Sequence, residues 1–223
     1  MGDVCVILGG GGHARVLIDC IQMIGRIKLV GILEHDRTRW GQELMNIPIL
    51  GGDDLLAEIS ARGVTCFVVG VGGTGNNQPR QRLYDMGLAN HLKPLTIVHP
   101  AAVCSRWAKV GAGSQLLPGS IINAGAVIGM NVIVNSGAIV EHDCVVGNHV
   151  HIATGAKLAS TVRVGDGAHI GAGATVRQCL TIGERAIIGA GAVVVKDVVA
   201  DTVVAGVPAR PLRRENPSGG SSA

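Results

Sequence analysis

The amino-acid sequence predicts a small α/β domain followed by a parallel β-helix. An apolar residue recurs at every sixth position in the second half of the chain, a glycine-rich turn separates a strand-like from a helix-like segment near the N-terminus, and 34 glycines stand against four aromatic residues. A core without large rings is typical of many thin, repeated layers. We predict a Rossmann-like α/β domain at residues 1–92, a β-helix at 93–212 and a disordered tail at 213–223.

The first strand, turn and helix follow one another at the N-terminus. Residues 4–8 are continuously apolar, which predicts a buried strand, and four glycines at 9–12 follow it. Residues 16–21 place apolar side chains at a helical spacing. The turn matches the G-x-G-x-x-A pattern of dinucleotide-binding turns, and an acidic residue, Glu34, ends the second predicted strand. At a helix N-terminus, such a turn offers free backbone N–H groups to an anion such as a pyrophosphate.

The rest of the α/β domain is short. A third strand at 66–72 and a helix near 80–86 complete a doubly wound βαβ unit by about residue 90. That length is too small for the two-halved sheet that usually holds NAD. Three alternatives stay open: a NAD-binding module joined to a structural β-helix, a purely structural β-helix protein, and a turn whose glycines only let the helix pack closely on its strand.

The second half of the chain repeats with a period of six residues. Every sixth residue from Val98 to Val194 is apolar, which makes seventeen positions, and the residue four further on is small or β-branched at all of them except Leu180. A period of six fits neither a helix nor an alternating strand. Three short sides would instead close a triangular coil of about 18 residues, and such coils would stack at roughly 4.8 Å by parallel pairing.

Composition excludes several classes of function. The net charge is +3 and the basic residues are scattered, which argues against a nucleic-acid partner. Residues 110–140 carry no charge, but Gly, Ser and Asn recur among them at fixed spacing, so the repeat explains this stretch better than a membrane span does. Six scattered cysteines and the absence of a signal-peptide pattern predict free thiols and a cytoplasmic location.

The repeat resembles a known family. Units such as Val-Gly-Asp-Gly-Ala-His and Ile-Gly-Ala-Gly-Ala-Thr are similar to those of the bacterial hexapeptide-repeat transferases, and Ala-Gly-Val-Pro-Ala-Arg at 205–210 resembles the segment that closes their helices. The resemblance implies a left-handed β-helix and acetyl-CoA as co-substrate. It also implies a homotrimer with active sites between neighbouring helices.

The glycine turn restricts the resemblance to two groups within this family. A Gly-x-x-Gly-His-Ala-Arg turn joined to a hexapeptide helix, with His99-Pro100 at the junction, resembles the amino-sugar N-acetyltransferases of bacillosamine and perosamine pathways and the sialic acid O-acetyltransferase group. The first of these groups implies N-acetylation of a UDP- or GDP-linked 4-amino-4,6-dideoxy sugar for surface glycan or O-antigen biosynthesis. The second implies O-acetylation of a sialic acid or a related sugar. The implied substrate-binding residues are Gly11, Gly12, His13, Glu34, His35 and Gly51.

His142 is the candidate catalytic base. Acyl transfer to an amine or hydroxyl requires a group that accepts the proton of the nucleophile, and imidazole suits this role near neutral pH. His142 lies between Glu141 and Asp143, and either carboxylate could fix its tautomer. The residues alone leave that choice open, whereas the family pattern favours Asp143.

The resemblance also implies contacts with acetyl-CoA. His151 resembles the family position that contacts the acetyl-CoA arm, and Ala172 and Ala190 resemble positions that line the pantetheine groove with backbone groups. His149, which has no such match, is expected at the surface. Although His149 and His151 form a His-x-His pair, no third ligand has suitable spacing, so we expect no metal.

Overall fold

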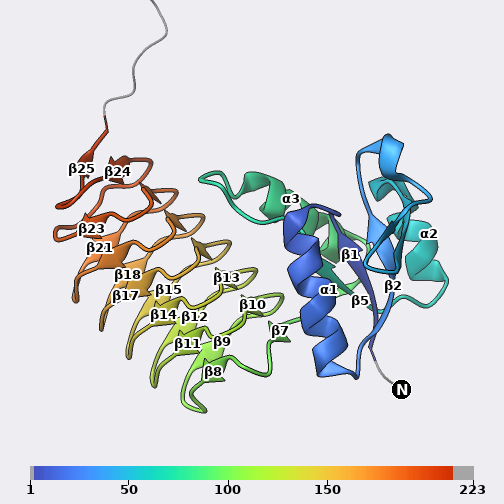
Figure 1. Ribbon diagram of the computed structural model, residues 1–223, viewed down its shortest axis with the longest axis horizontal. Helices are drawn as coiled ribbons and strands as arrows, with labels where there is room; N and C mark the ends of the chain where they lie inside the picture. The colour runs from blue at the N-terminus through green and yellow to red at the C-terminus, as the bar shows by residue number, and fades with distance from the viewer. Residues whose placement is uncertain (1–2, 213–223) are drawn as a thin grey trace, which may run out of the picture.

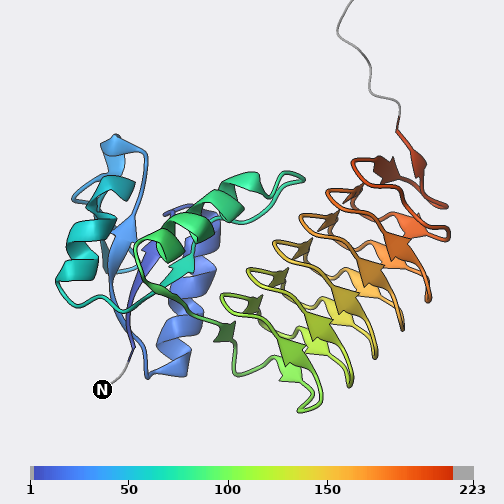
Figure 2. The same ribbon diagram turned by 180° about the vertical axis from the view of Figure 1, so that it is seen from behind.

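The computed structural model describes residues 3–212, which form an α/β domain and a three-sided parallel β-helix, as predicted (Figure 1). The tail predicted at 213–223 lies outside the described residues. The α/β domain stands beside the N-terminal coils of the β-helix, and α3 and the loop before it reach along the β-helix (Figures 1 and 2).

The α/β domain contains a six-stranded sheet in the order β3-β4-β2-β1-β5-β6. All strands run parallel except β3, which pairs antiparallel with β4. The strands are β1 (Val4–Leu8), β2 (Lys28–Leu33), β3 (Glu43–Leu44), β4 (Ile47–Gly51), β5 (Cys66–Val69) and β6 (Lys93–Pro94). The helices are α1 (Gly12–Ile24), α2 (Leu56–Ala61) and α3 (Gln78–Ala89), with short 3-10 helices at η1 (Arg37–Arg39) and η2 (Asp53–Leu55).

Apolar side chains on the two faces of this sheet form two clusters. One face packs against α1, whose buried residues repeat at a helical spacing through Leu17, Ile18 and Ile21. The other face packs against α2 and α3. The predicted strand, turn and helix are therefore confirmed, although β5 ends at Val69 and α3 is longer than the predicted helix at 80–86.

The β-helix has three sheets, one for each side of the coil. Up to β20, each strand pairs with the strand 18 residues further on, whereas β22 pairs with β24 sixteen residues further on. The first sheet contains β7 (Ile97–Val98), β10 (Gln115–Leu116), β13 (Ile133–Val134), β16 (His151–Ile152), β19 (His169–Ile170), β22 (Ile187–Ile188), β24 (Val203–Ala205) and the antiparallel β25 (Arg210–Pro211). The second contains β8 (Val103–Cys104), β11 (Ile121–Ile122), β14 (Ile139–Val140), β17 (Lys157–Leu158), β20 (Thr175–Val176) and β23 (Val193–Val194). The third contains β9 (Lys109–Val110), β12 (Val127–Ile128), β15 (Val145–Val146), β18 (Arg163–Val164) and β21 (Thr181–Ile182).

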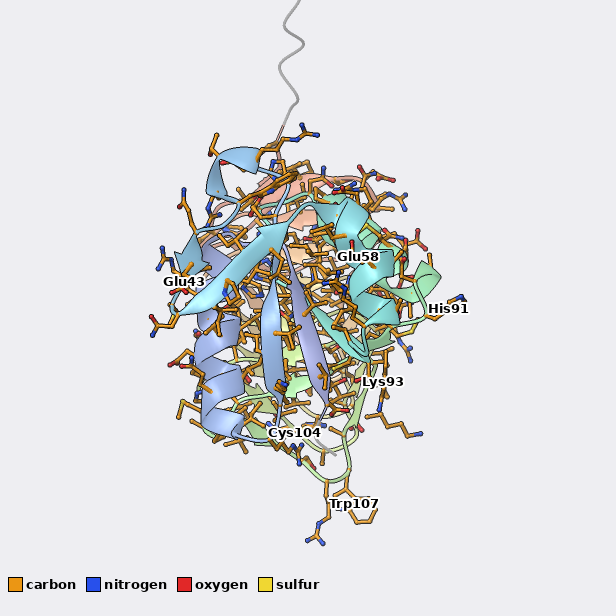
Figure 3. The ribbon with its side chains drawn as sticks, turned by 90° about the vertical axis from the view of Figure 1, so that its right-hand side faces the viewer. Glu43, Glu58, His91, Lys93, Cys104 and Trp107 are labelled. Carbon is orange, nitrogen blue, oxygen red and sulfur yellow. The ribbon has the colours of Figure 1, made fainter. Side chains whose placement is uncertain are left out.

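The second residue of each two-residue strand points into the β-helix, as the hexads predict. From Leu116 to Val194, these apolar residues are buried and stack into one continuous core. The first coil differs, because Val98 and Cys104, also predicted to point inward, are exposed. Since this coil has a neighbour on one side only, its inner face is not covered. Cys104 and Trp107 lie at this end of the molecule in Figure 3.

The α/β domain packs on the first sheet of the β-helix. Ile97, Leu117 and Ile133 belong to the same apolar cluster as the buried face of α1. Hydrogen bonds from the α/β domain to the β-helix reach the first sheet and its two flanking corners. We call the corner after each sheet by that sheet's number, so the second corner lies opposite the first sheet.

Candidate active site

A cavity of about 380 Å³ opens beside the glycine turn, where β1 and β2 end. The carboxyl ends of parallel strands are the usual place for ligands in open α/β sheets. The cavity is lined by Gly9, Gly10, Gly11, Glu34, His35, Asp53, Val71, Pro79, Arg82 and Leu83. It therefore brings together three of the predicted substrate-binding residues, Gly11, Glu34 and His35.

The carboxylate of Glu34 organises this cavity. Glu34 is 5% exposed, and its carboxylate accepts hydrogen bonds from the backbone N–H groups of Gly10 at 2.8 Å and Asp36 at 3.1 Å. Burial by itself raises the pKa of Glu34, but these two hydrogen bonds and the nearby His35 and Arg39 outweigh it, so the pKa is lowered. A negative charge at the strand end thus holds the glycine turn in place.

The other predicted substrate-binding residues lie around the cavity rather than in its wall. Gly51 accepts a hydrogen bond from the backbone N–H of Glu34 at 2.8 Å and has a φ of +153°, where a Cβ would lie 2.5 Å from Leu55. Gly12 is exposed at the first position of α1. His13 follows it and turns toward the β-helix, where its Nε2 lies 2.7 Å from Oε1 of Gln115. Burial, with a smaller contribution from the charge of Arg80, lowers the pKa of His13 to about 4.

His142 lies at the second corner of the β-helix, two residues after β14. Its Nδ1 lies 2.9 Å from Oδ2 of Asp143, and the two side chains are 57% and 60% exposed. Asp143 has a φ of +60°, a conformation that aspartate tolerates better than most residues do. Glu141 instead accepts a hydrogen bond from Asn123 at 2.9 Å. The choice that the sequence left open is therefore resolved geometrically: the carboxylate against the imidazole ring belongs to Asp143.

A second cavity of about 380 Å³ lies next to this pair. Asp143, Thr161, Arg163, Cys179, Leu180 and Thr181 line it. Asp143, the partner of the base candidate, thus lines an open hollow on this side of the β-helix.

The two cavities lie on opposite sides of the β-helix. The residue after the glycine turn, His13, contacts the first sheet, whereas His142 lies on the second corner. In a three-sided coil that corner is the one most distant from the first sheet. Within one chain, His142 therefore does not reach the cavity beside the glycine turn.

His151 lies on the first sheet and is buried. Its Nδ1 bonds with the carbonyl of Gly73 at 2.8 Å and its Nε2 with the amide of Asn135 at 3.1 Å, so both ring nitrogens have partners. Burial, together with neighbouring His169, lowers the pKa of His151 to about 3. A ring contact between His151 and acetyl-CoA would have to replace one of these bonds.

Ala172 and Ala190 lie at the first corner and are exposed. They occupy equivalent positions one coil apart, and the carbonyl of Ala172 accepts a hydrogen bond from Gly191 at 2.8 Å. Their small side chains leave the backbone of this corner accessible to a ligand.

His149 lies at the third corner, where the expectation of a surface position needs correction. It is half-buried, its ring packs edge-on against Tyr84 at 5.6 Å between centroids, and its Nδ1 bonds with the Asn131 amide at 2.9 Å. Burial lowers its pKa. The contact arises because α3 covers this corner, which no local pattern predicts.

Sequence reasoning missed several polar residues at the boundary between the domain and the β-helix. Arg80 is fully buried and donates to the carbonyls of Val69, Val71 and Asn131. Gln115 is also fully buried and joins His13 to Val69. One signal for Gln115 was present in the repeat, since this polar residue lies 18 positions from Ile97 and from Ile133 on an apolar face.

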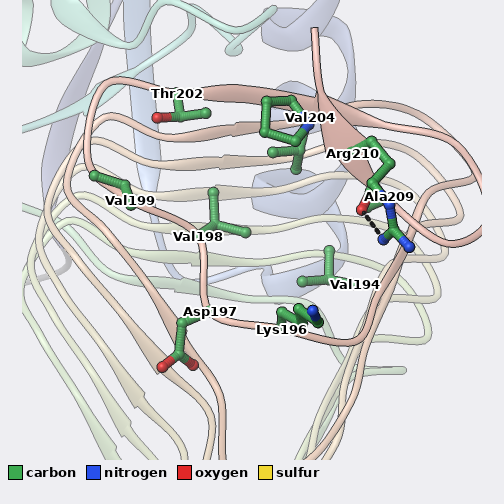
Figure 4. A pocket seen from close by; sticks show the side chains of 10 residues that line it. Val194, Lys196, Asp197, Val198, Val199, Thr202, Val204, Ala209 and Arg210 are labelled. Carbon is green, nitrogen blue, oxygen red and sulfur yellow. Dashed lines mark hydrogen bonds between the residues drawn. The ribbon is translucent and has the colours of Figure 1, made fainter.

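A larger hollow of about 590 Å³ lies at the last coil, where the apolar core of the β-helix ends (Figure 4). Val194, Val198 and Val204 line it together with Lys196 and Arg210. None of the predicted site residues lies there. Over residues 3–212, no group of three or more His, Cys, Asp or Glu side chains is placed to hold a metal ion. None of the helices in this part of the chain is long and apolar enough to cross a membrane.

The buried histidines predict a loss of stability at acidic pH. Because the pKa values of His13 and His151 are about 4 and 3 when folded, the unfolded chain takes up protons below about pH 6.5 that the folded chain excludes. Stability is thus full above that pH and falls as the pH drops toward the folded values. We expect the free energy of unfolding to fall by about 2 kcal/mol per histidine between pH 7 and pH 5.

Denaturant titrations at the two pH values measure this effect. The variant His151→Asn should show a smaller drop than the wild type, whereas His142→Asn, at an exposed position, serves as the control. An unchanged drop in His151→Asn would contradict the assignment.

Comparison with known proteins assigns both halves of the chain. Residues 5–86 match the PglD N-terminal domain family, and residues 143–178 and 161–196 match the bacterial transferase hexapeptide family (six repeats). No curated protein matches the chain.

Solved structures match over nearly the whole length. The acetyltransferase domain of PglB from Neisseria gonorrhoeae has a TM-score of 0.87 and 34% identity, over 95% of this chain and 100% of that one. PerB from Caulobacter crescentus, solved in complex with CoA and GDP-perosamine, has a TM-score of 0.88 and 34% identity, over 96% and 98%. WeeI from Acinetobacter baumannii has a TM-score of 0.82 and 27% identity, over 94% and 99%.

Proposed function

The chain belongs to the PglD-type hexapeptide acetyltransferases, and on that basis we propose that it transfers the acetyl group of acetyl-CoA to the amine of a nucleotide-linked 4-amino-4,6-dideoxy sugar. The nucleotide is UDP or GDP, and the product serves surface glycan biosynthesis. Support comes from the relatives: PglB was solved with acetyl-CoA, and PerB with CoA and GDP-perosamine.

The observation that carries the proposal is the cavity beside the glycine turn. A diphosphate fits its wall of glycines at the α1 N-terminus, because backbone N–H groups there bind anions. Arg82 adds a positive charge, which lies 3.5 Å from Asp53. The buried carboxylate of Glu34 accepts a hydrogen bond from the backbone N–H of Gly10 and so stabilises the conformation of the turn. In this proposal, Gly11, Gly12, Glu34 and His35 bind the nucleotide-sugar, and Gly51 supports Glu34.

His142 is the base in the proposed reaction. The amine nitrogen of the sugar attacks the thioester carbonyl carbon, and Nε2 of His142 takes the proton that the amine loses. The Asp143 carboxylate at 2.9 Å accepts from Nδ1–H, which leaves Nε2 unprotonated and stabilises the imidazolium that forms. When the carbon–sulfur bond breaks, the imidazolium returns the proton to the CoA thiolate.

The proposed site is built from two chains of a homotrimer. His142 lies on the corner opposite the first sheet, away from the glycine turn of its own chain. In the proposed trimer it serves the glycine turn of a neighbouring chain instead. The exposed first corner of that neighbour offers Ala172 and Ala190 to the pantetheine arm. His151 contributes to the acetyl-CoA site from the neighbouring first sheet. Because both of its ring nitrogens are engaged, we infer that it supports the loop at Gly73 and does not contact the thioester directly.

An acceptor screen tests the proposal. Purified protein and acetyl-CoA are combined with UDP-linked 4-amino sugars, GDP-linked 4-amino sugars or free sialic acid, and released thiol is measured. We expect thiol release with one of the two nucleotide-sugar classes and none with sialic acid. Release with sialic acid alone would replace the proposal by O-acetylation, and release with no acceptor would reject it.

Replacing Glu34 tests the role of the cavity. Glu34→Gln removes the charge that accepts the N–H groups of Gly10 and Asp36, so we expect the KM for the nucleotide-sugar to rise about tenfold. The KM for acetyl-CoA should not change, because that site lies on the β-helix. Glu58→Gln is the matched control, since Glu58 forms an exposed ion pair with Arg62 on α2, away from the cavity. Equal effects on both KM values would show general misfolding instead.

A further inference from the structure

We propose that Gln115 is a positioning residue that holds the ring of His13 with its Nδ1 free to accept a hydrogen bond from the acceptor sugar. This inference rests on the proposed function, and it makes His13 a group that orients the substrate beside His142 of the neighbouring chain. The inference is based on two hydrogen bonds of the buried Gln115 side chain, one to the Val69 carbonyl and one to the ring of His13.

The orientation of the Gln115 amide is determined by its surroundings. Gln115 is fully buried, and its Nε2 donates to the carbonyl of Val69 at 2.9 Å. Arg80 donates to the same carbonyl at 3.0 Å, so this oxygen is an acceptor in both contacts. A reversed amide would place Oε1 against the Val69 carbonyl oxygen, with two acceptors facing each other. Oε1 must therefore point the other way, toward His13.

The Gln115 amide in turn determines the form of His13. Oε1 can only accept, and it lies 2.7 Å from Nε2 of His13, so Nε2 carries the hydrogen. Burial and the charge of Arg80 keep the ring neutral. A neutral ring with hydrogen on Nε2 has an unprotonated Nδ1. His13 is thereby an acceptor of hydrogen bonds and not a carrier of protons, which leaves the proton transfer to His142.

The free nitrogen of His13 lies close to residues that line the substrate cavity. His13 lies two residues after Gly11, which lines the cavity, and its ring lies against Gly72, next to the cavity residue Val71. No described residue bonds with Nδ1, and this nitrogen is not fully buried. An amine N–H or a sugar hydroxyl entering from the cavity can donate to it.

A structural role for Gln115 is the competing explanation. Its neighbours on the same face of the first sheet, Ile97 and Ile133, are apolar and pack against the α1 side of the domain. An apolar residue would complete that face without burying an amide, so the glutamine needs a reason beyond packing. Fixing His13 supplies that reason, and it makes a prediction that packing does not.

A double-mutant cycle with Gln115→Met and His13→Ala tests the inference in the full-length enzyme. With the best acceptor from the screen, Gln115→Met should lower kcat about tenfold while the KM for acetyl-CoA stays unchanged. In the His13→Ala background, the same change should lower kcat less than twofold, because Gln115 acts through His13. Gln81→Met is the matched control, since Gln81 is exposed on α3. Equal losses in both backgrounds would overturn the inference.

A spectroscopic measurement is independent of turnover. In long-range ¹H–¹⁵N spectra, the wild-type His13 ring should show hydrogen on Nε2 alone, whereas Gln115→Met should show a mixture of both tautomers. An Nδ1-protonated ring in the wild type would overturn the inference even if Gln115→Met fails to fold. If no acceptor supports turnover, the proposed function fails, yet the tautomer of His13 is still measured.

Discussion

Replacing His142 with asparagine is expected to lower kcat by about three orders of magnitude, with little change in the KM for either substrate. Asparagine keeps the size and polarity of the side chain but cannot take the proton from the attacking amine. The effect should be chemical rather than structural, because the His142 side chain is 57% exposed and does not belong to the buried core of the β-helix. Steady-state kinetics by thiol release, with the melting temperature measured in parallel, test this.

The neighbouring carboxylate provides a graded comparison. Asp143→Asn keeps a residue that tolerates the φ of +60° but removes the charge at 2.9 Å from Nδ1. We expect kcat to fall by about ten- to a hundredfold, less than in His142→Asn. Glu141→Gln should have a small effect, since Glu141 bonds with Asn123 and not with the imidazole. Normal turnover in His142→Asn would rule out His142 as the base.

Mixing two inactive variants is expected to restore activity. In the proposed arrangement, His142 of one chain serves the glycine turn of its neighbour, so each site needs one intact residue from each of two chains. When equal amounts of His142→Asn and a severe cavity variant, Glu34→Arg, are unfolded and refolded together, about a quarter of the sites should contain both intact parts. Activity should therefore rise from near zero to about a quarter of the wild-type value.

Separate refolding of each variant followed by mixing is the control. It should restore activity only as fast as the chains exchange. If co-refolding restores nothing while both variants are folded and oligomeric, the base and the cavity act within one chain. That outcome would require His142 to reach its own glycine turn around the β-helix, against the geometry described above.

The β-helix was readable from the sequence because its rules are local. A residue that points inward recurs every six positions, so the hexads from Leu116 to Val194 predict the buried core without any long-range information. The same rule failed at Val98 and Cys104, because a repeat does not indicate which coil lies at an end of the stack and leaves its inner residues exposed. The glycine turn and Glu34 were readable for a similar reason, since a strand, a turn and a helix follow one another directly.

The surroundings of the histidines near the site depend on contacts between segments that are distant in the sequence. His13 and Gln115 are 102 positions apart, and Gly73 and His151 are 78 apart. No local pattern predicted that Nε2 of His13 would bond with Gln115 of the β-helix, that His151 would have both ring nitrogens engaged, or that α3 would cover His149.

Local periodicity therefore predicted the architecture. Together with the family resemblance, it also predicted the candidate base His142. Whether a polar side chain is free for chemistry depends instead on which groups surround it in three dimensions, because a buried hydrogen-bond partner sets its charge and its tautomer. Packing of the α/β domain on the first sheet buries His13 and His151, which lowers their pKa values and keeps both rings neutral. The same packing leaves His142 exposed on the opposite corner.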